Sequence, residues 1–369
     1  MSAEIDEQDL TDAALALRDQ ARAIIRENYL DGDQRPWVVS YSGGKDSTLL
    51  AHLVFEAVAS VRPSQRTRRV YVVCSDTRVE TPELAEHVHQ SVMAIDRAAR
   101  AMDLPLSAHV VVPPLNDSFW VRIVGLGYPP PSHMFRWCTD RMKINPSNSF
   151  IREHIDPSGK VLLMIGARSS ESYTRAKSLE RHNISGDFQT HRRLPSALIW
   201  APIKEMSTDE VWRILIFTPP PWGGSHVPLR NLYKDAHAGE CFLVTQEGTD
   251  PCGNSRFGCW TCTVVERDRS LEGLIASGRD YSKLSDFRDH LIRLRDSRHE
   301  FREERRKNGQ PGIGPLRMHV REDLLAQLLS LEEETGLQLI TPEEVSAIRL
   351  AWIGESMDRS SVPVGTLDG

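Results

Sequence analysis

A short glycine-rich segment carries the clearest chemistry in this sequence. Residues 42–47 read Ser-Gly-Gly-Lys-Asp-Ser and follow the apolar run 37–39. Gly43 and Gly44 allow a tight turn whose backbone N–H groups face an anion, and Lys45 adds a positive charge. The helix expected next adds the partial positive charge of its N-terminus. The segment predicts a phosphate-binding loop made by Ser42, Gly43, Gly44, Lys45, Asp46 and Ser47; the alternative is a plain glycine-rich turn.

Two further polar segments are expected beside this loop. Asp76 and Thr77 follow one predicted strand, and Gly166 and Arg168 follow another. Ligands of parallel sheets bind at the carboxyl ends of the strands, so all four residues are candidates to meet a nucleotide. The alternatives are a strand-ending turn at Asp76 and an ordinary surface ion-pair set around Arg168.

The six cysteines are clustered in a way that favours a metal centre over disulfides. Cys252, Cys259 and Cys262 follow the spacing Cys-x6-Cys-x2-Cys, and Cys138 could supply a fourth thiolate from a distant segment. Four thiolates suit either a structural Zn²⁺ or a [4Fe–4S] cluster, and the spacing leaves both open. Cys74, within a predicted strand, is expected to be a small core residue.

Short apolar runs alternate with helical patterns through the first half of the chain. Strands are predicted at 37–39, 70–74, 109–112 and 161–165, and helices at 10–28, 48–55 and 82–102. This alternation predicts the α/β class with a mostly parallel sheet. The expected divisions are an N-terminal helix (1–30), an α/β domain (31–217), a loop segment carrying cysteine ligands (218–275), a charged helical region (276–360) and a disordered tail (361–369).

The charge balance argues against a protein that coats nucleic acid without specificity, because the net charge is -6. A locally basic face remains an alternative at 288–306, which contains seven arginines among several carboxylates. The plainer interpretation, which we favour, is a solvated helix with ion pairs along its surface.

No stretch approaches the roughly 18 uninterrupted apolar residues of a membrane span. The first ten residues are acidic and lack a signal-peptide pattern. We therefore expect a cytoplasmic protein with no membrane partner.

The segment 42–47 resembles the PP-loop of ATP pyrophosphatases and differs from the Walker pattern in its glycine spacing. The resemblance implies the adenine nucleotide alpha hydrolase-like (HUP) fold and an enzyme that cleaves ATP to AMP and pyrophosphate. It also implies that Asp46 helps to hold Mg²⁺, with Lys45, Asp46 and Arg168 as catalytic residues.

A more specific resemblance rests on this loop together with Met-Phe-Arg-Trp-Cys-Thr at 134–139 and Arg-Phe-Gly-Cys-Trp-Thr-Cys-Thr at 256–263. These segments are similar to DndC, of the DNA phosphorothioation family, and to its counterpart SspD, both in the PAPS reductase-like branch. The resemblance implies a [4Fe–4S] sulfurtransferase that uses ATP to replace a DNA backbone phosphate oxygen with sulfur, as in bacterial defence against foreign DNA. It further implies a cysteine desulfurase as sulfur donor and other proteins of the phosphorothioation operon as partners. The C-terminus is shorter than in many DndC-like proteins, which leaves the choice between the two branches open.

Three alternatives remain. A PAPS or APS reductase needs a nucleophilic cysteine on its C-terminal tail, and no cysteine follows Cys262. A tRNA thiolation enzyme shares the PP-loop and an iron–sulfur site, and only the Cys-Trp-Thr-Cys resemblance argues against it. An ATP-responsive subunit without catalysis would bind ATP and release no pyrophosphate.

Overall fold

The computed structural model of the chain describes residues 7–169, 183–185, 188–191, 193–236, 258–296 and 298–361. The strands are β1 (Trp37–Tyr41), β2 (Val70–Ser75), β3 (Leu106–Val111), β4 (Leu162–Met164), β5 (Asn183–Ser185), β6 (Phe188–Thr190) and β7 (Leu198–Trp200). In the described residues they form one sheet in the order β3-β2-β1-β4-β7-β6-β5. The pairings from β3 through β7 are parallel, and β6 and β5 add an antiparallel edge. The predicted α/β class with a mostly parallel sheet is confirmed.

The helices that precede the C-terminal helical layer are α1 (Glu7–Leu30), α2 (Lys45–Ala59), α3 (Pro82–Ala101), α4 (Asn145–Phe150), α6 (Thr208–Phe217) and α7 (Val227–Ala236). Alternate residues of β1 enter opposite cores, because successive side chains of a strand point to opposite faces. Trp37 and Val39 join the core beneath α1, α2, α3 and α6, whereas Val38 packs with Ile151 on the face that carries α4.

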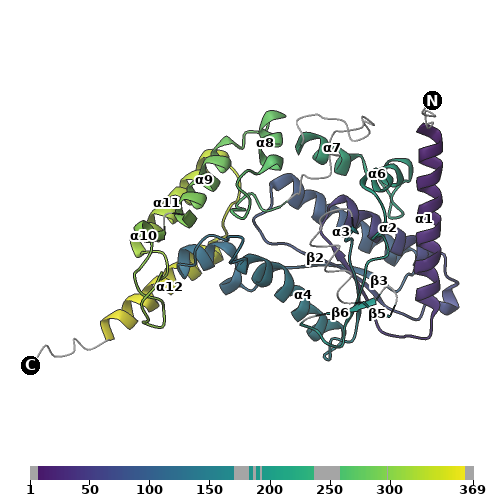
Figure 1. Ribbon diagram of the computed structural model, residues 1–369, viewed down its shortest axis with the longest axis horizontal. Helices are drawn as coiled ribbons and strands as arrows, with labels where there is room; N and C mark the ends of the chain where they lie inside the picture. The colour runs from purple at the N-terminus through teal and green to yellow at the C-terminus, as the bar shows by residue number, and fades with distance from the viewer. Residues whose placement is uncertain are drawn as a thin grey trace, which may run out of the picture.

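A second hydrophobic core lies under the C-terminal helices α8 (Arg269–Ala276), α9 (Ser282–Asp296), α10 (Arg298–Phe301), α11 (Met318–Thr335) and α12 (Pro342–Ser361). Figure 1 shows this helical layer on the side of the molecule away from α1. The segment 119–142, which contains the π-helices η3 (Val121–Gly125) and η4 (Thr139–Ile144), also packs into it. Residues inside the expected α/β domain therefore help to build the C-terminal core.

The expected divisions differ from the structure in two further places. The segment 218–275, expected to be loop, includes α7 and most of α8. The N-terminal helix begins at Glu7, and α12 continues to Ser361, the first residue of the expected tail. Residues 1–6 and 362–369 lie outside the described residues. Within the described ranges, no helix has an apolar run long enough to cross a membrane.

Short linking elements complete the first half: η1 (Pro63–Gln65), η2 (Leu115–Asp117) and η5 (Ile151–Ile155). Several element ends differ from the sequence prediction by a few residues. Strand β1 continues to Tyr41 past the exposed Ser40, a polar residue that ended the apolar pattern. Helix α2 begins at Lys45 instead of residue 48, so the phosphate-loop turn is confined to Ser42–Gly44.

Candidate active site

The phosphate loop lies where the strand order reverses. Strand β1 pairs with β2 on one side and with β4 on the other, so the loop after β1 occupies the topological switch point at which open α/β sheets bind ligands. The register pairs Tyr41 with Cys74 and Val39 with Met164. The segments that begin at residues 42, 75 and 165 therefore leave the same edge of the sheet, as the sequence predicts.

The backbone conformation and the close packing at position 43 require glycine. Its φ is +74°, and a Cβ there would stand 2.3 Å from Cγ2 of Val88 on α3. The Ser47 hydroxyl donates to the Gly44 carbonyl at 3.0 Å and accepts from the Ser42 backbone N–H at 3.1 Å. The Ser42 hydroxyl oxygen lies 3.1 Å from the Ser47 hydroxyl oxygen. The two serines thus close the turn on itself.

Lys45, Asp46 and Arg168 meet beside this turn. The Lys45 ammonium is 2.9 Å from Oδ2 of Asp46, and Nε of Arg168 donates to Oδ1 at 2.7 Å. Lys45 and Arg168 are almost fully buried. Two buried cations thus lie at the N-terminus of α2, an arrangement that suits a phosphate. The structure therefore brings together the three residues predicted to be catalytic.

Arg168 is held in place from several directions. It donates to the Met206 carbonyl at 3.1 Å and to the Thr208 hydroxyl at 2.9 Å. Gly166 packs directly on the start of α2, where a Cβ would stand 2.9 Å from backbone atoms of Asp46 and Ser47. Arg168 itself is thus buried and fitted against the phosphate loop. Residues 170–182, which follow this segment, lie outside the described residues.

Tyr233 is a member of the site that sequence reasoning missed. Its hydroxyl accepts the Lys45 backbone N–H at 3.2 Å, and its ring centroid is 5.7 Å from the Lys45 ammonium. Burial raises its pKa, so the phenol stays protonated. Only its place in the amphipathic pattern of α7 could have signalled its burial, and nothing in that pattern indicates Lys45 as its partner.

Asp76 and Thr77, which follow β2, contact different parts of the molecule. Asp76 accepts from the Arg78 backbone N–H at 2.7 Å and pairs with His89 of α3 at 3.0 Å. Thr77 is buried, and its hydroxyl lies 2.5 Å from Oε1 of Glu80 and 3.3 Å from the Cys259 sulfur. The loop after β2 therefore connects the nucleotide edge of the sheet to the cysteine segment.

Three of the four predicted thiol ligands approach one another. Cys138 immediately precedes η4, and Cys259 joins Glu80 in a short antiparallel bridge. Burial raises the pKa of Cys138, and the negative charge of Cys262 raises it further. Burial also raises the pKa of Cys259, to about 12. Cys252 lies outside the described residues.

As placed, the described His, Cys, Asp and Glu side chains include no group of three or more that could hold a metal ion. The donor chemistry nevertheless fits a thiolate-bound centre, because thiols from segments more than a hundred residues apart converge. Lys143 lies among them, and its pKa is raised chiefly by the charge of Cys259. Sequence reasoning missed this cation. Cys74 is buried in the first core, as predicted.

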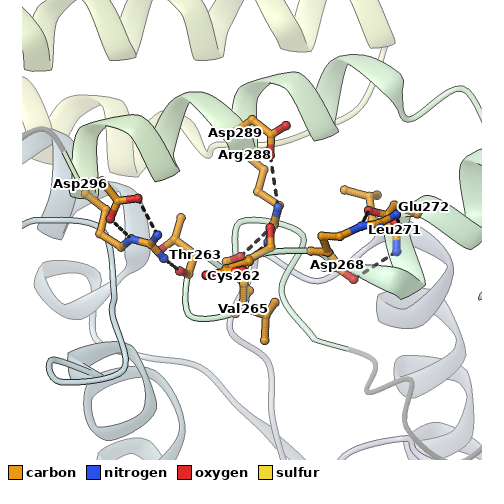
Figure 2. Close-up of polar contacts among 12 residues, drawn as sticks. Cys262, Thr263, Val265, Asp268, Leu271, Glu272, Arg288, Asp289 and Asp296 are labelled. Atoms are coloured by element: carbon orange, nitrogen blue, oxygen red, sulfur yellow. Dashed lines mark hydrogen bonds and ion pairs between the residues drawn. The ribbon is translucent and has the colours of Figure 1, made fainter.

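Arginines expected on a solvated helix instead support the cysteine loop. Arg288 is buried and donates to the carbonyls of Cys262 at 2.9 Å, Val265 at 2.6 Å and Glu266 at 3.2 Å. Arg295 donates to the Thr263 carbonyl while pairing with Asp296 (Figure 2). The interpretation of 288–306 as a purely solvated face is therefore wrong for these two residues.

Asp46, the predicted Mg²⁺ ligand, is held between two cations. One of its carboxylate oxygens accepts a hydrogen bond from Lys45 and the other from Arg168. Asp46 therefore positions both cations.

Fold and loop together define an α/β protein with a mostly parallel sheet and a glycine-rich loop at its switch point. Residues 36–265 match the family model of the phosphoadenosine phosphosulfate reductase domain, so the chain belongs to this family. Its members are enzymes that act on nucleotides. An uncharacterized protein of Methanocaldococcus jannaschii is 23% identical over 277 residues, which are 75% of this chain and 45% of the relative. The chain thus spans less than half of the length of that relative.

Solved structures with similar folds include the phosphoadenylyl-sulfate (PAPS) reductase of Candida auris in a phosphate complex. It is 10% identical, with a TM-score of 0.32, covering 58% of this chain and 88% of the reductase. The U34-tRNA thiolase NcsA of Methanococcus maripaludis with its [4Fe-4S] cluster is 13% identical, with a TM-score of 0.35, covering 76% and 79% of the respective chains.

Proposed function

We propose that this chain is an ATP pyrophosphatase and sulfurtransferase that activates a DNA backbone phosphate and helps to replace one of its oxygens with sulfur. The observation that carries the proposal is the convergence of Lys45 and Arg168 on Asp46 at the N-terminus of α2. Such a buried, positively charged site suits the phosphates of ATP. The loop from Asp76 to Glu80 adds support. It follows β2 at the edge of the sheet where the phosphate loop lies, and its residues Thr77 and Glu80 contact Cys259.

The chemistry proceeds in two substitutions. A non-bridging oxygen of the DNA phosphate attacks the α-phosphorus of ATP, and pyrophosphate leaves. A sulfide-level nucleophile, drawn from a cysteine desulfurase with a thiol reductant, then attacks the activated DNA phosphorus, and AMP leaves with the original oxygen. Lys45 and Arg168 would balance the charge that develops on the leaving pyrophosphate. Proteins of the same operon are the expected partners.

A [4Fe–4S] cluster would be held by the four thiolates of Cys138, Cys252, Cys259 and Cys262 and would supply iron–sulfur chemistry there; one thiolate would have to leave its iron before sulfur could bind to the cluster. Support comes from Cys138, Cys259 and Cys262, which approach one another beside the loop that follows β2. A Cys259→Ser protein is expected to lose sulfur transfer while retaining ATP binding. If it keeps its fold and full sulfur transfer, the thiol site has a structural role alone.

The test uses purified full-length protein, ATP and either DNA or tRNA, with pyrophosphate release as the readout. The wild-type protein should release pyrophosphate when DNA is present, and Lys45→Ala should not. Lys160→Ala, a change at an exposed lysine outside the site, serves as the matched control. Release with tRNA alone would instead favour tRNA thiolation. Binding of ATP without release under any condition would indicate an ATP-responsive subunit.

A further inference from the structure

A cavity of about 640 Å³ lies on the helical side of the molecule, away from the phosphate loop. One wall is the segment 126–135, which follows η3, and the other comes from the end of α9 and from residues 302–315. Its volume falls within the range of small-ligand sites. None of the roles described above uses this cavity.

Its first wall presents aromatic and apolar side chains to solvent. Phe135 is 46% exposed and Met134 is 95% exposed. The ring of Phe135 is near-parallel to that of Tyr128, with an interplanar angle of 18° and centroids 6.4 Å apart. Tyr128 is fixed from behind by Arg122, whose guanidinium carbon lies 4.9 Å from the ring centroid. The wall thus forms a supported stacking platform.

The opposite wall is cationic. Its basic side chains are Arg295, Arg302, Arg306 and Lys307, and no Asp or Glu occurs among the described lining residues. Burial lowers the pKa of the Lys307 ammonium. The negative charge of Glu355 raises this pKa, and the positive charges of Arg321 and Arg122 lower it. Because Arg295 is paired with Asp296, the cationic character of this wall rests mainly on Arg306 and Lys307.

The cavity is joined to the cysteine loop. The Thr263 hydroxyl donates to the Pro131 carbonyl at 2.6 Å, and Arg295 of the cavity wall donates to the Thr263 carbonyl. Figure 2 shows Thr263, the residue that Arg295 contacts, beside Cys262. On the other side, Phe135 is followed within a few residues by Cys138. A ligand in the cavity therefore lies beside two of the predicted thiol ligands.

We infer that this cavity binds an unpaired nucleotide of a DNA strand, with the base stacked on Phe135 and the flanking phosphates held by Arg306 and Lys307. Aromatic platforms beside cationic grooves are the common means of holding single strands, because every base has a face that stacks and every phosphate is an anion. A paired base cannot reach such a platform without leaving its helix. The inference rests on the proposed function for the choice of DNA, whereas the binding itself needs no ATP.

The experiment measures fluorescence anisotropy of labelled oligonucleotides with the full chain in the absence of ATP. The oligonucleotides are a single-stranded DNA, the same sequence as RNA, and the duplex DNA. We expect single-stranded DNA to bind more tightly than duplex. Phe135→Ala should weaken this binding about ten-fold, and Phe135→Trp, which keeps a stacking face, should preserve it. The double variant Arg306→Gln, Lys307→Gln should lower the slope of log affinity against log salt by about 0.7 for each phosphate that the variant no longer neutralises.

Matched controls are Phe217→Ala and Arg100→Gln, both at exposed positions outside the cavity. They should bind like the wild-type protein, and all variants should keep its unfolding temperature. Equal affinity in Phe135→Ala and the wild-type protein would overturn the inference, as would binding of duplex alone or of RNA alone. Single-strand binding through these residues without any release of pyrophosphate would contradict the proposed function and leave the cavity assignment standing.

Discussion

Nε of Arg168 donates to Oδ1 of Asp46 at 2.7 Å, across a separation of 122 residues in the chain. This bond joins the segment after β4 to the phosphate loop after β1, and these are the two segments that flank the switch point of the sheet. Because Asp46 also holds the Lys45 ammonium, the position of each cation depends on the other.

Replacing Arg168 with lysine tests this coupling. Lysine keeps the charge but cannot donate to Asp46, Met206 and Thr208 at once, because it lacks the guanidinium fork. We expect pyrophosphate release to fall on the order of 100-fold from misplacement of the cations, and stability to fall by about 1–3 kcal/mol. Steady-state assays and chemical unfolding measure both effects. Arg100→Lys, on the exposed side of α3, is the control, and an unchanged rate in Arg168→Lys would contradict the coupling.

Gly166→Ala should displace the start of α2. The added Cβ would stand 2.9 Å from the Asp46 carbonyl carbon and oxygen, so the backbone must move. We expect a loss of about 1–3 kcal/mol in stability and weaker ATP binding, measured by unfolding and by calorimetric titration. Gly32→Ala provides the control, since a Cβ there meets nothing within 4 Å. Similar behaviour of the two variants would show that the close packing at Gly166 has no consequence.

Arg288→Gln should loosen the cysteine loop. The guanidinium is the hydrogen-bond donor for the carbonyls of Cys262, Val265 and Glu266, and glutamine cannot reach all three. We expect faster labelling of Cys262 by a thiol reagent in the metal-free protein, and less retained iron after anaerobic purification. Arg293→Gln, at an exposed position on the same helix, should change neither quantity. Labelling at the wild-type rate would indicate that the loop is held by other contacts.

Sequence reasoning located the phosphate loop because its members are contiguous and their backbone role is local. It also anticipated Gly166 and Arg168, because the ends of parallel strands meet at one edge. It could not pair Thr77 with Cys259, since those residues are separated by 182 positions and the contact arises from the docking of two cores. It misjudged Arg288 for a related reason. The partners of that side chain are backbone carbonyls, which leave no pattern in a sequence.

Acid should destabilise the protein through His226. Burial, together with the charges of His52 and His87, lowers its pKa from 6.5 to about 3, so it stays neutral when folded. The unfolded chain binds a proton below pH 6.5 that the folded chain rejects. Stability is therefore full above this pH and falls as the pH drops toward 3, by up to about 1.4 kcal/mol per pH unit.

His226→Gln should reduce this slope between pH 6.5 and 5, as measured by urea unfolding at each pH. Glutamine can keep the contact with Nδ1 of His52, which lies 3.3 Å from Nε2 of His226. His319→Gln, at an exposed position on α11, should leave the slope unchanged. Equal slopes in His226→Gln and the wild-type protein would place the acid sensitivity at another residue.

The most direct test of the proposed function is mass spectrometry of digested total DNA and total RNA from a host with the complete gene neighbourhood. The gene is supplied intact, as Lys45→Ala or as the control Lys160→Ala. We predict phosphorothioate-linked dinucleotides in DNA with the intact gene and with Lys160→Ala, and none with Lys45→Ala. Unchanged DNA together with loss of a thionucleoside from RNA in Lys45→Ala would contradict DNA backbone sulfuration and identify RNA as the substrate.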